Sequence, residues 1–185
     1  MISENILELS LREFRRTKQL ADRAIDQLTD EEIFRLMETD GNSVAIIVKH
    51  VAGNLRSRWR DFLTTDGEKP DRDRDSEFLL DAADTRDALL QRWEEGWEIL
   101  FAALSPLSES DLTREVRIRG EGLSVLQAIQ RQMTHYAYHV GQIVLLARTW
   151  RGSAWETLSV AKGQSQAFNR APESYLTGGT DSEAR

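Results

Sequence analysis

The three histidines of this sequence are spaced as metal ligands would be. His135 and His139 lie four residues apart, in a stretch whose apolar residues recur with helical periodicity. Residues four apart share one face of a helix, with Cβ atoms about 5–6 Å apart, so both imidazoles could bind one metal ion. His50 lies in a second stretch of helical periodicity. If these two helices pack side by side, all three side chains can converge on one point.

Three imidazole ligands would define a particular kind of metal site. Neutral imidazole suits zinc, nickel, copper and ferrous iron. Three protein ligands beside an open position are typical of catalytic zinc sites, whereas structural sites are closed. Because imidazoles add no negative charge, the ion would keep its +2 charge and lower the pKa of a bound water toward about 7. We therefore predict that His50, His135 and His139 bind a divalent transition metal, and that water, a thiolate or a substrate oxygen takes the open position.

Polar residues near the histidines have two interpretations. Asn54 lies one helical turn after His50, and Gln132 and Gln142 flank the histidine pair. Such amides could orient the ligands or hydrogen-bond a bound water. Polar residues are also common at the boundary of a core, and we favour that simpler interpretation for all three amides.

The sequence does not single out a catalytic acid or base. Asp61 lies three helical turns from His50, and Glu13 lies on the apolar stripe of another helix, where the edge of a bundle would explain it. Lys162 and Ser165 could close over the site as a lid, but simple packing of their segment is the preferred interpretation. We assign a catalytic role to none of these residues.

Helical periodicity predicts an all-α fold. Apolar residues recur at about 100° per residue in four long segments. We expect these helices at about Ser3–Leu28, Asn42–Thr64, Thr85–Leu104 and Ser124–Trp150. Four helices of this length, joined by loops, indicate a helical bundle. We predict one domain over residues 1–170 and a flexible C-terminal tail over residues 171–185, where apolar residues are few.

The connections between these helices carry weaker signals. Residues 64–84 alternate acids with arginines and are expected to form an exposed loop. Val116 and Ile118 alternate with arginines as in a strand, although one short strand could not build a sheet alone. The segment after Gly152 carries aromatic residues that should pack on the bundle.

Composition limits the classes of function. The chain has 185 residues, of which 40% are hydrophobic and 30% charged, as in a globular domain without a membrane span. The absence of cysteine excludes disulfides, cysteine-ligated zinc and a cysteine nucleophile. A net charge of −7 disfavours a nucleic-acid surface. With no secretory signal visible, we expect a cytoplasmic protein that acts on a small molecule.

Two segments resemble the DinB/YfiT-like superfamily, whose members are considered metalloenzymes. They are residues 42–50, which end in His50, and residues 135–142, which begin His135-Tyr-Ala-Tyr-His139. The resemblance covers about residues 2–148. It implies a four-helix bundle with up-down-down-up connections, a three-histidine site, nickel or zinc as the metal, and a homodimer. Some members of the superfamily transfer low-molecular-weight thiols such as bacillithiol or mycothiol, and others are hydrolases or isomerases.

Two hypotheses follow from these observations. In the first, the chain is a metal-dependent enzyme, either an S-transferase that activates an external thiol or a hydrolase that uses metal-bound water; zinc or nickel is the expected metal, with iron as a third choice. In the second, it is a non-catalytic, dimeric helical module that binds metal weakly or not at all. The sequence names neither the substrate nor the general base.

Overall fold

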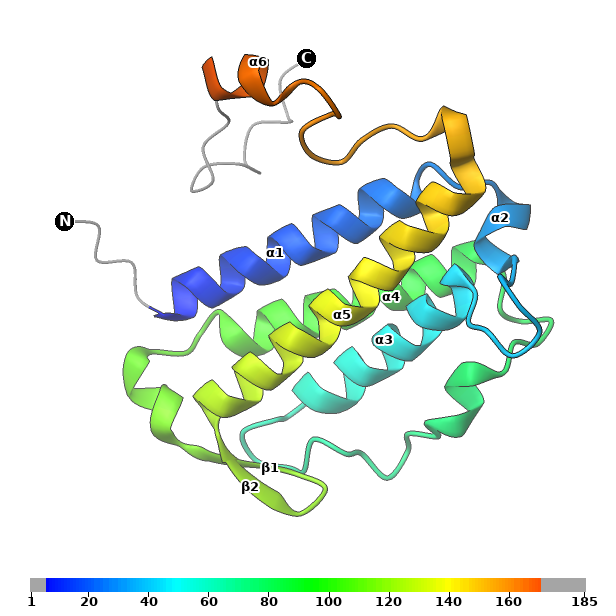
Figure 1. Cartoon of the computed structure of the whole chain (residues 1–185). Coiled ribbons are helices and arrows are strands. Elements are labelled where there is room, and N and C mark those ends of the chain that lie inside the picture. Colours follow the sequence, from blue (N-terminus) through cyan, green and yellow to red (C-terminus); the bar gives the residue numbers. More distant parts are fainter. Residues whose placement is uncertain (1–5, 171–185) are drawn as a thin grey trace.

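The computed structural model describes residues 6–170, and most of them are helical (Figure 1). The helices are α1 (Ile6–Ile25), α2 (Asp30–Phe34), α3 (Val44–Trp59), α4 (Arg86–Leu104), α5 (Val125–Arg151) and α6 (Ser165–Arg170). Short 3-10 helices are η1 (Asp75–Phe78), η2 (Glu109–Thr113) and η3 (Gly152–Ala154), and two strands are β1 (Glu115–Ile118) and β2 (Glu121–Ser124). The prediction of a mainly helical fold is therefore confirmed, with one small hairpin added.

The long helices begin where the sequence supplies capping hydroxyls. Ser43, Thr85 and Ser124 cap α3, α4 and α5, and each side chain accepts a hydrogen bond from a backbone N–H of the first turn. The predicted starts of these helices are correct to within two residues. The predicted end of the second helix, at Thr64, is wrong. The chain leaves helical geometry at Arg60, and Asp61 adopts a positive φ of 49°, which an α-helix of L-residues cannot continue.

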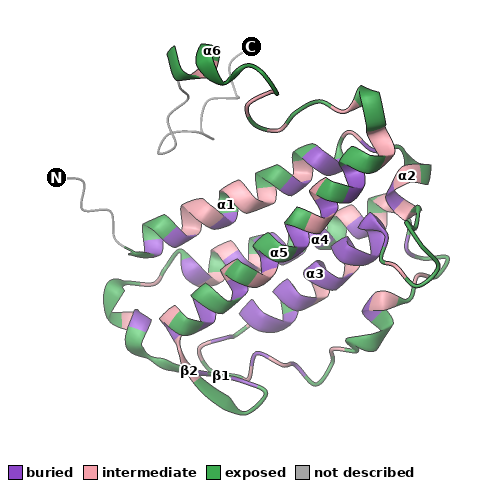
Figure 2. Cartoon of the chain, in the orientation of Figure 1, coloured by how far each residue is buried: buried purple, intermediate pink, exposed green. Residues whose placement is uncertain are grey.

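The long helices α1, α3, α4 and α5 lie side by side and enclose the core (Figure 1). The most extensive packing is between α3 and α4 and between α1 and α5, while α3 also contacts α5. Most of α3 is buried, whereas α1 and α5 each keep one exposed face (Figure 2). The largest fully buried side chains include Phe14, Trp59, Trp93, Trp97 and Tyr136. The histidine-bearing helices α3 and α5 are thus held by an aromatic core.

The strand-like segment at Val116 and Ile118 pairs with a second strand that follows it directly in the chain. β1 pairs antiparallel with β2 through a two-residue turn at Arg119 and Gly120, and both residues have positive φ angles. This backbone geometry matches the twist of a tight hairpin. The side chains of Val116 and Ile118 point into the core, as their alternation predicts. The Asp66 carboxylate accepts the N–H groups of the two turn residues and ties the hairpin to the connection after α3.

The connection over residues 64–84 is only partly the exposed loop that its charges suggest. Lys69, Glu77 and Asp84 are all buried within it. Each makes hydrogen bonds with neighbouring groups, which offset the cost of removing a charge from water. Of the alternating charges at residues 71–75, Arg72 pairs with Glu77 inside the protein, whereas the others stay exposed as predicted.

The segment after α5 packs only at its start. Trp155 and Leu158 are partly buried against the core, whereas α6 contributes no buried residue. The predicted tail over residues 171–185 lies outside the described residues, as does the predicted beginning of the first helix. Across residues 6–170, no helix combines the length and the apolar character that crossing a membrane requires.

Two glycines should respond in opposite ways to alanine. A Cβ at Gly96 of α4 would lie 3.0 Å from the Leu55 Cβ of α3, whereas a Cβ at Gly141 of α5 would meet no atom within 4 Å. Alanine favours a helix over glycine by about 0.5–1 kcal/mol. We expect Gly141→Ala to raise the free energy of unfolding by about that amount. Gly96→Ala should lower it by about 1 kcal/mol, because overpacking outweighs the helix preference.

Urea unfolding of both variants beside the wild type measures this difference. Equal stabilisation by both substitutions would contradict the close approach of α3 and α4 at Gly96.

Candidate metal centre

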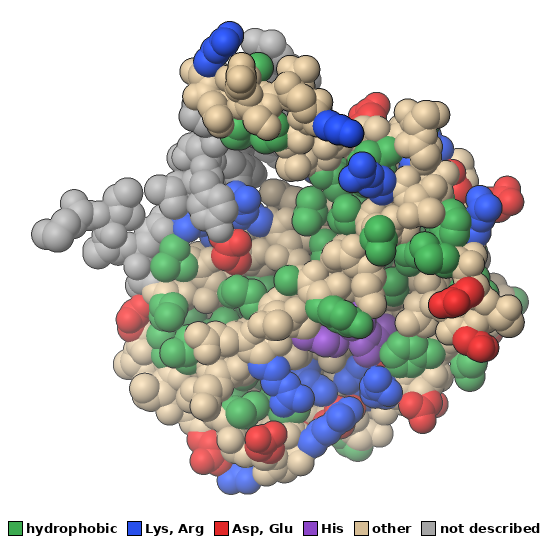
Figure 3. Space-filling view, in the orientation of Figure 1, with side chains coloured by type: hydrophobic (Ala, Val, Ile, Leu, Met, Phe, Trp, Pro, Cys, Tyr) green, Lys and Arg blue, Asp and Glu red, His purple; other side chains and the backbone are tan. Residues whose placement is uncertain are grey.

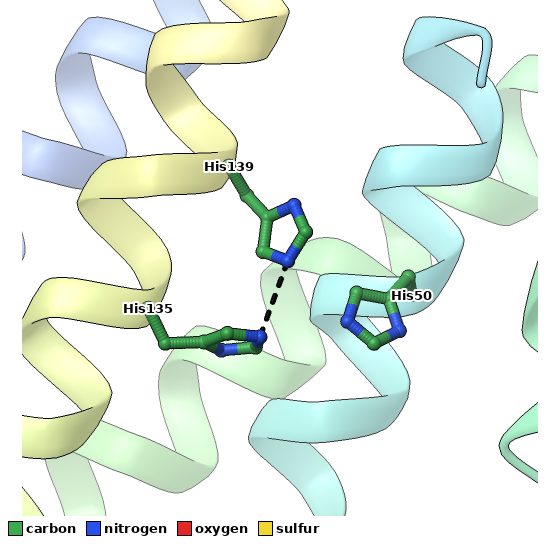
Figure 4. Close-up of side chains that lie close together, drawn as sticks. All are labelled: His50, His135 and His139. Atoms are coloured by element: carbon green, nitrogen blue, oxygen red, sulfur yellow. Dashed lines mark hydrogen bonds between the residues drawn. The ribbon is translucent and has the colours of Figure 1, made fainter. Parts of the chain in front are cut away.

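The structure brings all three histidines together (Figure 4). His50 comes from α3, and His135 and His139 lie one turn apart on α5. One potential ligand atom from each residue can be chosen so that all three atoms lie within 4.8 Å of one another. In Figure 4, one ring nitrogen of His50 is turned toward the other two rings. The predicted convergence of the histidines is therefore present, and the group could hold a metal ion.

Hydrogen bonds at Nδ1 place the lone pairs of His50 and His139 on Nε2, the atom that would bind an ion. His50 Nδ1 lies 2.8 Å from Glu77 Oε2, and His139 Nδ1 lies 2.9 Å from Gln142 Oε1. Both partners present an oxygen acceptor, so each ring donates its Nδ1–H to that partner. A neutral imidazole that donates from Nδ1 carries its lone pair on Nε2. Metal-ligating histidines are usually oriented by an outer partner in this way.

The spacing of the Nε2 atoms fits a shared ion. His135 Nε2 donates a hydrogen bond to His139 Nε2 at 3.1 Å (Figure 4), and an ion bound between the two rings would take the place of that proton. Zinc–nitrogen bonds of 2.0–2.1 Å in a tetrahedron place ligand atoms about 3.3 Å apart. The pair on α5 already has nearly this spacing, whereas the three ligand atoms together lie within 4.8 Å and would draw closer around an ion. The buried Nδ1 of His135 has no hydrogen-bond partner among residues 6–170, so packing and its neighbour His139 orient this ring.

Burial keeps the rings on α5 neutral. Burial lowers the pKa of His135 to about 3, and the neighbouring His139, His50 and Arg58 reinforce that shift. Burial also lowers the pKa of His139, although its hydrogen bond to Gln142 acts in the opposite direction. Both imidazoles are therefore unprotonated near neutral pH, which is the form that binds a metal ion.

A buried charge cluster lies beside His50. Glu77 is only 6% exposed. Arg72 donates from Nε to Glu77 Oε1 at 2.8 Å and from Nη2 to Oε2 at 2.9 Å. Burial acts to raise the pKa of Glu77, but the hydrogen bonds from His50 and Arg72 outweigh it and hold this pKa below its usual value. The carboxylate next to His50 is therefore ionised at neutral pH.

Sequence reasoning missed Glu77 and Arg72, and it undervalued Gln142. Gln142 follows His139 by three residues and so shares its helix face, a signal that was available. Glu77 follows His50 by 27 residues in an irregular connection, where no periodicity could mark it.

Two of the three amides, Asn54 and Gln132, lie inside the core rather than at its boundary. Gln132 Nε2 donates to Asn54 Oδ1 at 2.9 Å, and Tyr136 Oη donates to the same oxygen at 3.1 Å. The Tyr136 hydroxyl also accepts from Trp59 Nε1 at 3.0 Å. These groups satisfy one another in a buried network and make no hydrogen bond to a histidine. Asn54 and Gln132 thus join α3 to α5 close to the site.

The carboxylates that were weighed as bases do not join the histidines. Asp61 is exposed beyond the end of α3, and Glu13 pairs with Arg16 on α1 at 4.0 Å. Lys162 and Ser165, considered as a lid, are exposed residues near the start of α6. None of the four is brought to the histidine cluster.

The site opens toward one face of the molecule. Figure 3 shows histidine atoms at this surface, bordered by hydrophobic side chains and by a group of lysines and arginines. His50 and His139 are nearly buried, whereas His135 is more exposed. Phe78 lies against His50, with ring centroids 4.8 Å apart, and Arg74 lies over the Phe78 ring. A small molecule could therefore approach the histidines from this face.

Most of the chain matches a known protein family. A family model described as "Protein of unknown function (DUF1572)" matches residues 1–164, a span that contains all three histidines and Glu77. The chain belongs to the DUF1572 family. No curated protein matches the chain. The DUF1572 match covers the long helices and the hairpin and ends before α6.

Proposed function

We propose that the chain is a metal-dependent enzyme in which His50, His135 and His139 hold one divalent transition metal. The observation that carries this proposal is the convergence of three imidazoles, two of them with Nδ1 engaged by an acceptor. Zinc and nickel suit such a donor set, and ferrous iron is also compatible with it. The set contains no carboxylate or thiolate, so the full charge of the ion would be available to a substrate.

We further propose that the long helices form a four-helix bundle of the DinB/YfiT-like type, with up-down-down-up connections. The side-by-side packing of α1, α3, α4 and α5 supports this assignment. The placement of one histidine on α3 and a pair on α5 also matches the pattern of that superfamily. The hairpin and η1 are additions between the helices.

An S-transferase is the preferred activity within this proposal. A divalent ion held by His50, His135 and His139 would lower the pKa of a thiol or water beside it and so supply a nucleophile at neutral pH. The chain's own part is to keep His135 and His139 neutral by burial and to fix the rings of His50 and His139 through Glu77 and Gln142. Because the chain contains no cysteine, an external thiol has no internal competitor. Hydrolysis is the variant of this activity that uses water as the nucleophile.

A thiol-dependence assay separates the two activities. The protein loaded with zinc or nickel is mixed with a chromogenic electrophile, with and without a low-molecular-weight thiol. We expect turnover that rises with thiol concentration and falls at least tenfold in His139→Ala. Turnover without any dependence on thiol would rule out the transferase and leave the hydrolase.

A non-catalytic dimeric module remains the alternative function. Tyr138 and Leu145 are about 60% exposed and lie seven residues apart on α5, so they form an apolar strip on one helix face. A second copy of the chain is the partner that we propose for this strip. Sedimentation of the wild type beside Leu145→Glu tests the dimer. A dimer that persists in this variant would contradict the strip as its interface.

A further inference from the structure

Glu77 reaches His50 from a part of the chain that is remote in sequence. It lies in η1, within the connection between α3 and α4, while His50 lies in the first half of α3. The Glu77 carboxylate accepts the Nδ1–H of His50 at 2.8 Å. Both side chains are more than nine-tenths buried. Solvent therefore does not compete for this hydrogen bond, and the position of Glu77 directly affects the orientation of the His50 ring.

Arg72 holds the Glu77 carboxylate in a fixed orientation. Its guanidinium binds both carboxylate oxygens, each at less than 3 Å, and its side chain is 5% exposed. A planar guanidinium that binds both oxygens restrains rotation of the carboxylate as well as its position. Glu77 thus presents Oε2 to His50 in one orientation.

Gly53 provides the space that Glu77 occupies. It lies one helical turn after His50 on α3. A Cβ at this position would lie 2.2 Å from Glu77 Oε1 and 2.8 Å from Glu77 Cδ, closer than atoms can approach. The clash is with the carboxylate itself, which Arg72 and His50 hold on its other sides. Any larger residue at position 53 would therefore displace Glu77 from its place beside His50.

We propose that Glu77 is the positioning residue of the metal site. It holds the His50 ring with Nδ1 as hydrogen-bond donor and Nε2 directed to the ion. Gly53 leaves the space that the Glu77 carboxylate occupies. The inference deepens the proposed function and rests on it. It adds the connection between α3 and α4 to a site otherwise built from two helices. Outer partners of this kind typically change metal affinity by 10- to 100-fold.

The alternative is that Glu77 and Arg72 are a structural ion pair that happens to touch His50. Both interpretations predict that loss of the carboxylate lowers stability, so stability alone cannot separate them. Metal affinity and the geometry of the bound ion can separate them, because a purely structural pair would leave both unchanged in any variant that folds.

The test measures zinc affinity and the visible spectrum of the Co²⁺-loaded protein in full-length variants. Glu77→Gln keeps the size of the side chain but removes its charge, and Gly53→Ala displaces the carboxylate without changing it. Gly141→Ala is the matched control, since it makes the same glycine-to-alanine change in a helix where the Cβ meets no atom within 4 Å. Circular dichroism confirms that each variant folds.

We expect zinc binding to weaken 10- to 100-fold in Glu77→Gln and about tenfold in Gly53→Ala, with an altered Co²⁺ spectrum in both. Gly141→Ala should match the wild type. In a Glu77→Ala background, adding Gly53→Ala should cost no further affinity, because the clashing group is gone. If Glu77→Ala does not fold, the comparison of Gly53→Ala with Gly141→Ala decides the question.

Wild-type affinity and spectrum in both Glu77→Gln and Gly53→Ala would overturn the positioning role and leave the metal site intact. Failure of the wild type itself to bind zinc, nickel or cobalt would instead overturn the proposed function, and the inference with it.

Discussion

Replacing His50, His135 or His139 with alanine is expected to weaken zinc binding by more than about 100-fold. Each substitution removes one of three nitrogen ligands, a larger loss than the 10- to 100-fold typical of an outer partner. The three residues should behave alike, since their ligand atoms all lie within 4.8 Å of one another. Competition with a chromogenic chelator measures the affinities in wild type and variants.

Thr134→Ala is the control for this series. Thr134 is exposed and precedes His135 on α5, and its side-chain hydroxyl donates a hydrogen bond to the carbonyl of Gln130. Its loss should leave zinc affinity within about twofold of the wild type. The shared site would be contradicted if one histidine variant lost zinc while another kept wild-type affinity.

Replacing Asp84 with alanine is expected to lower the free energy of unfolding by about 3 kcal/mol. The Asp84 side chain is 1% exposed and accepts from Lys49 Nζ at 2.6 Å, Arg92 Nη1 at 2.8 Å and the Asp81 N–H at 3.0 Å. Loss of one partner from a buried ion pair costs about 3–5 kcal/mol. The lower end applies here because Arg92 is partly exposed and can regain water. Urea unfolding at pH 7 gives the value.

This contribution should depend on pH with a definite sign. Burial acts to raise the pKa of Asp84, but hydrogen bonds from Lys49, the Asp81 N–H and Arg92 outweigh it and hold the pKa below its usual value. A carboxyl group whose pKa is lower in the folded state than in the unfolded state contributes to the free energy of unfolding. This contribution is complete at pH values above the unfolded pKa, about 3.9. The difference between wild type and Asp84→Ala should thus stay constant from pH 5 to 8. It should shrink below about pH 4, as Asp84 becomes protonated.

Asp75→Ala provides the control within the same connection. The Asp75 side chain is 96% exposed, and its ion pair with Arg74 spans 3.7 Å. An exposed pair of this kind contributes less than about 1 kcal/mol. Similar losses of stability in Asp75→Ala and Asp84→Ala would show that the connection is solvated, as its sequence first suggested, and not held between α3 and α4.

Helical periodicity was sufficient to place the metal-binding candidates. A repeat of 3.6 residues and local capping groups define α3 and α5, and these are properties of neighbouring residues. The positions of His135 and His139 on one face of α5 follow from their spacing alone. The meeting with His50 required only that the apolar stripes of α3 and α5 pack together.

Residues 64–84 show what such local reasoning omits. Their alternating acids and arginines have no helical or strand period, and the same composition suits either solvent or a paired interior. The outcome depends on contacts with distant residues: Glu77 meets His50, and Asp84 meets Lys49 and Arg92. Only the folded arrangement of α3 and α4 reveals these pairs. The role of Gly53 could not be inferred for the same reason, because its neighbour Glu77 is 24 positions away.

The metal content of the purified, tag-free protein tests the central claim most directly. Elemental analysis is made on the protein as isolated and after incubation with zinc or nickel followed by dialysis, beside His50→Ala and His139→Ala. The convergence of the three imidazoles predicts about one transition-metal ion per chain in the wild type and almost none in either variant. A wild type that retains no metal after both incubations would contradict the metal centre and favour the non-catalytic module.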